Sequence, residues 1–108
     1  MASILIIDDE VAIATAFAMF FRHDGAHIVT EAHTGADGVE AYRRLRPDLV
    51  LLDVRLPDMT GFDVLSHMRR SERWRDTPCI VLTAAGQEAQ YQRAFALGAT
   101  EFMTKPFS

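Results

Sequence analysis

The chain has 108 residues, which is the size of one compact domain. Its composition, 49% apolar and 24% charged residues, is that of an ordinary globular protein and argues against disorder. Eleven basic and fifteen acidic residues give a net charge of −4, which argues against a general nucleic-acid-binding surface, and no apolar run approaches the roughly 20 residues of a membrane-spanning helix. The only cysteine, Cys79, can form no internal disulfide bond, which fits a cytoplasmic location, and it forms no zinc-spaced cluster with the four histidines.

The first half of the chain predicts a strand, a helix, a strand and a helix. Residues 3–7 form an apolar run that stops at Asp8, and residues 27–32 form a weaker run. Apolar residues recur at helical spacing in the two segments that follow these runs: Ile13, Ala16, Phe17 and Phe20 in the first, and Val39, Tyr42 and Leu45 in the second. The first helix is expected to end near Gly25 and the second before Pro47.

The second half repeats this alternation and ends on a strand. Apolar runs cover residues 49–52, 79–82 and 101–104, of which the first two show no polar alternation and are typical of strands buried on both faces. Helical spacing is again evident in two segments: Phe62, Leu65 and Met68 in one, and Tyr91, Ala94, Phe95 and Leu97, closed by Gly98, in the other. The sequence therefore predicts right-handed strand–helix–strand units, that is, an α/β fold with a doubly wound parallel sheet of five strands.

Polar residues stand at the carboxyl ends of four of these strands. In open α/β sheets, ligands bind beyond the carboxyl ends of the strands, at the point where the strand order reverses. With a flavodoxin-like order of 2-1-3-4-5, the first and third strands are neighbours at that point. We therefore expect Asp8, Asp9 and Asp53 to share one crevice, flanked by Thr83 and Lys105.

This set of residues suits phosphoryl chemistry. Three carboxylates in one crevice repel one another unless a cation neutralises them, and oxygen donors favour a hard cation such as Mg²⁺. Lys105, the only lysine in the chain, and the hydroxyl of Thr83 can both bind phosphoryl oxygens. A carboxylate nucleophile, a metal ion and two donors are sufficient, because phosphoryl transfer depends mainly on positioning and charge neutralisation.

Four motifs, in chain order, resemble those of the receiver domain of two-component response regulators. They are Ile-Ile-Asp8-Asp9-Glu10, Leu-Leu-Asp53-Val-Arg-Leu-Pro57-Asp-Met-Thr-Gly61, Leu-Thr83-Ala84 and Lys105-Pro106-Phe107. The resemblance spans nearly the whole chain. It implies one receiver domain over residues 1–108, acting as a Mg²⁺-dependent switch in a bacterial phosphorelay and as a regulatory module rather than a metabolic enzyme.

The resemblance also implies a role for individual residues. Asp53 would accept a phosphoryl group from a histidine kinase or a histidine phosphotransfer protein, and Thr83 and Lys105 would hold the phosphoryl oxygens. The implied metal ligands are Asp8, Asp9, Asp53 and the backbone carbonyl of Arg55. The remaining implied roles are phosphate access beside the small Ala84, a change of rotamer at Phe102 when Thr83 moves, and a cis bond before Pro106.

Two features depart from the family pattern. The sequence stops at Ser108, where the family continues into a fifth helix, so we expect a domain truncated after its fifth strand. The first helix is also unusually apolar: we expect Ile13, Phe17 and Phe20 to face the sheet. The opposite side would then be an exposed apolar surface for a homodimer or for partner docking, formed by Val11, Ala12, Ala14, Ala18 and Met19.

Three alternatives to these interpretations remain open. The pair Asp8 and Asp9, taken alone, could simply cap a helix. A phosphohydrolase of the haloacid-dehalogenase kind also uses an aspartate nucleophile and Mg²⁺, although that family requires Asp-x-Asp rather than adjacent aspartates. An adaptor on the same fold could work through its first helix without phosphorylation, but the complete acidic set argues against this.

Overall fold

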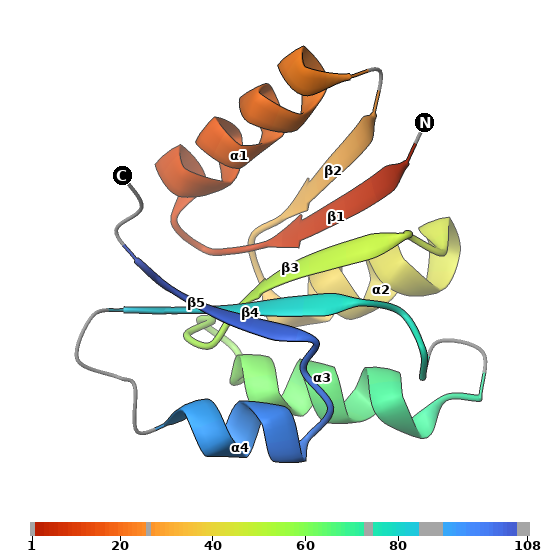
Figure 1. Cartoon of the computed structure of the whole chain (residues 1–108), viewed down its shortest axis with the longest axis vertical. Helices are drawn as coiled ribbons and strands as arrows, with labels where there is room; N and C mark the ends of the chain where they lie inside the picture. The colour runs from red at the N-terminus through yellow and green to blue at the C-terminus, as the bar shows by residue number, and fades with distance from the viewer. Residues whose placement is uncertain (1, 26, 73–74, 85–89, 106–108) are drawn as a thin grey trace.

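The computed structural model describes residues 2–25, 27–72, 75–84 and 90–105, and it has the predicted α/β architecture (Figure 1). The elements, in chain order, are β1 (Ser3–Ile7), α1 (Val11–Asp24), β2 (Ile28–Ala32), α2 (Gly35–Leu45), β3 (Leu49–Asp53), α3 (Gly61–Arg70), β4 (Cys79–Ala84), α4 (Tyr91–Ala96) and β5 (Glu101–Lys105). All strand pairs are parallel, and the sheet order is β2-β1-β3-β4-β5. The flavodoxin-like fold is therefore confirmed, with four helices within these described ranges.

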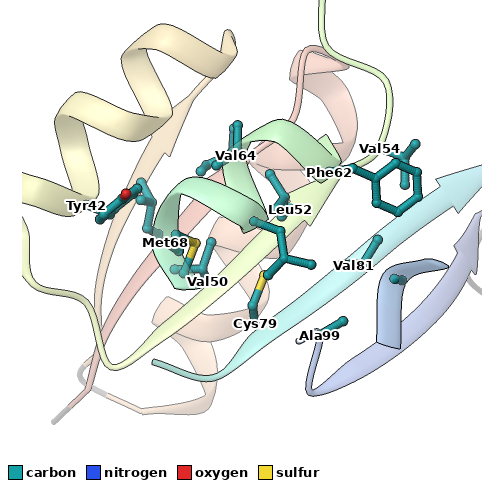
Figure 2. Close-up of a cluster of buried hydrophobic side chains, with 14 of the residues drawn as sticks. Tyr42, Val50, Leu52, Val54, Phe62, Val64, Met68, Cys79, Val81 and Ala99 are labelled. Carbon is teal, nitrogen blue, oxygen red and sulfur yellow. The ribbon is translucent and has the colours of Figure 1, made fainter. Parts of the chain in front are cut away.

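The sheet is covered on both faces, by α1 on one side and by α2, α3 and α4 on the other (Figure 1). Side chains of β1 alternate between the two hydrophobic cores on either side of the sheet. Leu5 and Ile7 belong to the core under α2–α4, and Ile4 and Ile6 belong to the core under α1. This double burial explains why the central strands are continuous apolar runs. Figure 2 shows the larger core, in which Tyr42, Phe62, Met68 and Cys79 are among the labelled side chains.

Local sequence signals fix where two helices begin. The hydroxyl of Thr34 accepts a hydrogen bond from the backbone N–H of Asp37 at 3.0 Å and thereby caps α2. At α3, Thr60 and Asp63 form a reciprocal capping box, in which each side chain accepts a hydrogen bond from the other's backbone N–H at 3.2 Å. Both caps lie beside the carboxyl edge of the sheet, so they stabilise the loops that surround the predicted crevice.

The orientation predicted for α1 is partly wrong: Ile13 and Phe17 are half-buried, and Phe17 packs against the core as predicted, but Phe20 does not face the sheet. Ala14 and Ala18 are fully buried against the sheet, whereas Phe20 is 63% exposed, so the predicted docking surface loses two of its members. The physical reason is size: alanines allow the helix backbone to approach β1 and β2 closely, and the partly buried Phe17 and Phe21 flank that contact. Because large apolar residues lie on several sides of the helix, their spacing in the sequence does not indicate which side faces the sheet.

An apolar groove lies beside α1. Val11 and Met19 are exposed as predicted, at 55% and 64%. Residues of α1 and of the neighbouring strands line a groove of about 580 Å³: Ala12, Ile13, Ala16, Phe17, Phe20, Phe21, Leu51, Ile80 and Met103. Despite this apolar surface, none of the described helices has both the length and the apolar content needed to cross a membrane.

Candidate functional site

Four buried polar side chains gather at the carboxyl edge of the sheet. Asp8 directly follows β1, Asp53 ends β3, Thr83 lies near the end of β4 and Lys105 ends β5. Within the described residues, these four make up the whole set of buried polar or charged side chains. Polar side chains are seldom fully buried unless they are paired or bind a ligand, so this edge is the candidate site of the molecule.

The acidic part of the site contains one more residue than predicted. Carboxylate oxygens of Asp8, Asp9, Glu10 and Asp53 all lie within 4.8 Å of one another. Asp8 Oδ1 also accepts a hydrogen bond of 2.9 Å from the backbone N–H of Glu10, which is the N-cap residue of α1 but makes no side-chain cap. The acidic residues therefore do not serve mainly as a helix cap, because their carboxylates converge on Asp53.

Lys105 lies among these carboxylates. Its Nζ donates hydrogen bonds to Glu10 Oε1 at 2.8 Å and to Asp53 Oδ2 at 3.2 Å, and it forms an ion pair with Asp8 Oδ2 at 2.8 Å. Burial alone would lower the pKa of Lys105, but these three carboxylates raise it above its ordinary value. The lysine is therefore a permanent positive charge beside Asp53.

Asp53 is the carboxyl with the most perturbed acidity. Burial is the main cause, and the neighbouring Asp8 adds to it; together they raise the pKa of Asp53 from 3.8 to about 7, against the opposing effects of Lys105 and of the Arg55 backbone N–H. That N–H donates to Asp53 Oδ1 at 3.2 Å. Burial disfavours the ionised form of Asp53, and each of its two oxygens accepts a hydrogen bond. Carboxyl groups with pKa values perturbed in this way are typical of functional sites.

The same residues suit a hard cation. Asp8 Oδ2 is buried, and its charge is balanced in the described structure by Lys105 Nζ, 2.8 Å away. The donor set consists of carboxylate oxygens alone, and Asp9 is exposed at the mouth of the site, where water has access. Carboxylates combined with water are the usual ligands of Mg²⁺, so the set fits that ion.

The loop after β3 is fixed at two points, which positions Asp53. Gly61 donates its backbone N–H to the Val54 carbonyl at 2.7 Å, and a Cβ at Gly61 would overlap the backbone carbonyl of Asp53, so the close approach requires glycine. Asp58 accepts hydrogen bonds from the backbone N–H groups of Gly35, at 2.7 Å, and Ala36, at 2.8 Å. These bonds lower the pKa of Asp58 and tie the loop to the beginning of α2.

Two of these contributors escaped the sequence analysis. Glu10 was visible in the first motif, directly after the aspartate pair, and its position in the short loop between β1 and α1 was the signal that could have assigned it to the site. Asp58 gave no such signal, because its partners are 22 and 23 residues away in the sequence. Only the packing of α2 beside the loop brings these groups together.

The remaining predicted residues occupy β4 and β5. Thr83 and Ala84 are the register partners of Thr104 and Lys105, so both strands end at the crevice. Phe102 is half-buried and its ring packs against Tyr91 of α4, with centroids 5.3 Å apart. The cis bond predicted before Pro106 lies outside the described residues.

Comparisons with known proteins place the chain among proteins of known family. Residues 4–108 match the family model described as the response regulator receiver domain. The chain is 42% identical, over 98% of its length, to the probable transcriptional regulatory protein TcrX of Mycobacterium tuberculosis, and 40% identical, over 99% of its length, to the DNA-binding dual master transcriptional regulator RpaA of Synechocystis. It spans 44% of each of these two relatives, which is less than half of their length.

Solved structures give the same result. The chemotaxis response regulator CheY4 of Vibrio cholerae superposes with a TM-score of 0.92 at 30% identity, covering 100% of this chain and 89% of that one. The receiver domain of HemR from Leptospira biflexa superposes with a TM-score of 0.89 at 34% identity, covering 100% and 85%. These matches do not test the predicted homodimer, which stays a prediction. The sequence match, the fold and the acidic crevice together establish that the chain belongs to the response regulator receiver domain family of bacterial two-component systems.

Proposed function

We propose that residues 1–108 act as a phosphorylation switch in which Asp53 is the phosphoacceptor. An Oδ oxygen of Asp53 attacks the phosphorus of a phosphohistidine on a histidine kinase or a histidine phosphotransfer protein. A P–O bond forms to Asp53 while the P–N bond breaks, and the leaving imidazole nitrogen keeps the electron pair. The other ring nitrogen of the phosphohistidine carries a proton, so the products are an acyl phosphate on Asp53 and a neutral histidine on the donor.

The observation that carries this proposal is the position of Asp53. It lies 3.2 Å from the ammonium of Lys105 and within 4.8 Å of the carboxylate oxygens of Asp8, Asp9 and Glu10, at the open edge of the sheet. Its surroundings supply cationic charge on one side and cation ligands on the other. Phosphoryl transfer needs this combination, because charge builds up on oxygens that must be neutralised in place.

The proposed metal ligands are Asp8, Asp9, Asp53 and the backbone carbonyl of Arg55. Bound Mg²⁺ would neutralise negative charge on the phosphoryl oxygens. The chain's own residues do the positioning: the Arg55 N–H orients Asp53 through Oδ1, and Lys105 and Thr83 donate to phosphoryl oxygens. The small side chain of Ala84 leaves the entrance open to the donor.

We infer that the signal leaves the site through β4, β5 and α4. Phosphorylation adds a charge of about −1.5 to −2 to the crevice, which draws Thr83 and Lys105 toward it. Phe102 follows Thr83 in this scheme, and its contact with the exposed Tyr91 gives the movement a route to the surface of α4. A partner or an output domain would then recognise the altered surface.

The direct test is intact mass spectrometry after incubation with acetyl phosphate and Mg²⁺. We expect the wild-type chain to gain one phosphoryl group, Asp53→Asn to gain none, and a chelator to abolish the gain. Asp76→Asn is the matched control, because Asp76 is an exposed aspartate outside the crevice. It should be phosphorylated like the wild type.

The same experiment separates the alternatives. A folded wild-type chain that gains no phosphoryl group would overturn the switch and favour the adaptor that works without phosphorylation. Continuous turnover of a phosphate ester, with no phosphoprotein accumulating, would instead favour a phosphohydrolase. Retained phosphorylation in Asp53→Asn would show that the acceptor is another residue.

A further inference from the structure

Glu10 is the one member of the Lys105 cluster for which the proposed function has no role. Its Oε1 accepts a hydrogen bond of 2.8 Å from Lys105 Nζ, which is shorter than the 3.2 Å bond from the same nitrogen to Asp53. In the described conformation the ammonium therefore has three carboxylate neighbours, namely Asp8, Asp53 and Glu10. An ammonium has three N–H bonds, so a phosphoryl oxygen can bind it well only if one neighbour withdraws.

The three neighbours differ in how easily they can withdraw. The side chains of Asp8 and Asp53 are 0% and 4% exposed, whereas that of Glu10 is 56% exposed. A buried carboxylate that loses its cation is left without solvation, but an exposed one is hydrated by water at little cost. Glu10 is therefore the contact that can be released.

The backbone around Glu10 also permits this release. Its N–H is held by Asp8 Oδ1 at 2.9 Å, and its carbonyl accepts the hydrogen bonds of Ile13 and Ala14 that begin α1. Its side chain makes no helix-capping hydrogen bond. The carboxylate can thus leave Lys105 by rotation about its own side-chain bonds, without moving β1 or α1.

We propose that Glu10 is a positioning residue that holds Lys105 in the unphosphorylated chain and gives up its place on Nζ to an oxygen of the phosphoryl group on Asp53. This inference deepens the proposed function and rests on it. Glu10 would then have two effects: it keeps the ammonium of Lys105 directed toward Asp53 before phosphorylation, and its charge opposes the entry of the anionic phosphoryl group.

The chain offers a direct probe of this exchange, because Lys105 is its only lysine. Lysine labelled with ¹³C at the ε position gives one side-chain signal, which reports the surroundings of the ammonium. Beryllofluoride with Mg²⁺ serves as the probe that mimics a phosphoryl group on a carboxylate. The variants are Glu10→Gln, which removes the charge, and Glu101→Gln, which makes the same change at the exposed first residue of β5, at the opposite end of that strand.

Without beryllofluoride, we expect the Lys105 signal of Glu10→Gln to differ from the wild type and that of Glu101→Gln to coincide with it. With beryllofluoride and Mg²⁺, all three signals should coincide, because Glu10 no longer contacts Nζ. With Mg²⁺ saturating for each variant, beryllofluoride should bind about two- to five-fold more tightly to Glu10→Gln, the effect of one exposed charge.

Three outcomes would contradict these proposals, and they are distinguishable. A difference between wild type and Glu10→Gln that persists in the beryllofluoride complex would show that Glu10 stays on Lys105. A fall in Mg²⁺ affinity of tenfold or more in Glu10→Gln, without tighter beryllofluoride binding, would make Glu10 a metal ligand instead. A wild-type chain that neither binds beryllofluoride nor gains a phosphoryl group would overturn the proposed function itself, and this inference with it.

Discussion

Gly61 lies directly against the backbone carbonyl of Asp53, and this contact holds the loop after β3 under the candidate acceptor. Because a Cβ at Gly61 would overlap backbone atoms of Asp53 and Val54, no rotation of a side chain can relieve the clash. The first residue of α3 therefore sets the position of the last residue of β3.

Gly61→Ala should accordingly lower the free energy of unfolding by about 1–3 kcal/mol, the usual cost of overpacking, as measured by urea denaturation. The matched control is Gly25→Ala, since a Cβ at Gly25 would make only ordinary contacts with His27 and its φ of −176° suits any residue. That variant should stay within about 0.5 kcal/mol of the wild type. Equal effects of the two substitutions would refute the close approach at Gly61.

The raised pKa of Asp53 predicts how stability depends on pH when metal is absent. Between pH 3.8 and about 7, the folded chain holds a proton on Asp53 that the unfolded chain releases. The free energy of unfolding should therefore fall as the pH rises through this interval and level off above it. Lys105, whose pKa is raised above its ordinary value, stays charged throughout and adds no slope.

Asp53→Asn isolates this contribution, because asparagine does not titrate. In chelator-treated samples, the variant should be more stable than the wild type at about pH 8, and the difference should shrink toward about pH 5, where Asp53 is protonated. Urea titrations across this range measure both quantities. A constant difference between the two proteins would mean that Asp53 is ionised at every pH tested.

Addition of Mg²⁺ should stabilise the folded chain, because the carboxylate cluster exists only there. At an ion concentration 100 times the dissociation constant, the gain in unfolding free energy is about 2.7 kcal/mol. Asp8→Asn should lose most of this gain, since Asp8 is a buried member of the carboxylate cluster and a proposed ligand of the ion. Asp37→Asn, which changes an exposed aspartate in the first turn of α2, should keep it. Equal Mg²⁺ stabilisation of both variants would place the ion elsewhere.

The orientation of α1 can be tested by a pair of substitutions on its two sides. Ala18→Leu inserts a larger side chain into the buried contact with the sheet and should cost about 1–3 kcal/mol. Phe20→Gln changes a side chain that is 63% exposed and should cost less than Ala18→Leu, about 1 kcal/mol or under, because it loses only an edge contact with Phe21. A larger loss of stability in Phe20→Gln than in Ala18→Leu would show that Phe20 faces the sheet, as helical spacing alone suggested.

The strands and the crevice could be predicted from the sequence because each depends on a local signal. A continuous apolar run that stops at a polar residue, as at Asp8 and Asp53, marks both a buried strand and its carboxyl end. The sheet order then brings those ends together. The orientation of α1 had no such signal, because apolar residues surround most of the helix and only packing against β1 and β2 selects its alanine side.

Contacts between distant loops were equally inaccessible. The hydrogen bonds of Asp58 to the beginning of α2 join segments more than 20 residues apart, and nothing in either segment specifies the other. The contact between Lys105 and Asp53 spans 52 residues, yet both residues end strands at the same edge of the sheet, and their proximity was predicted. Long-range contacts in the site are thus predictable where the sheet topology enforces them, and not where loops meet.

The reactivity of Cys79 tests how readily β4, the strand that also carries Thr83, opens to solvent. Burial raises the pKa of this thiol to about 12, against a weaker opposing effect of Arg69, so almost no reactive thiolate is present near neutral pH. Ellman's reagent should therefore label the folded chain far more slowly than the urea-unfolded chain. Met68→Ala opens space in the core that contains Cys79 and should speed labelling of the folded chain (Figure 2). Rapid labelling of the wild type would show that β4 opens readily, and the movement proposed for Thr83 would then need no phosphorylation.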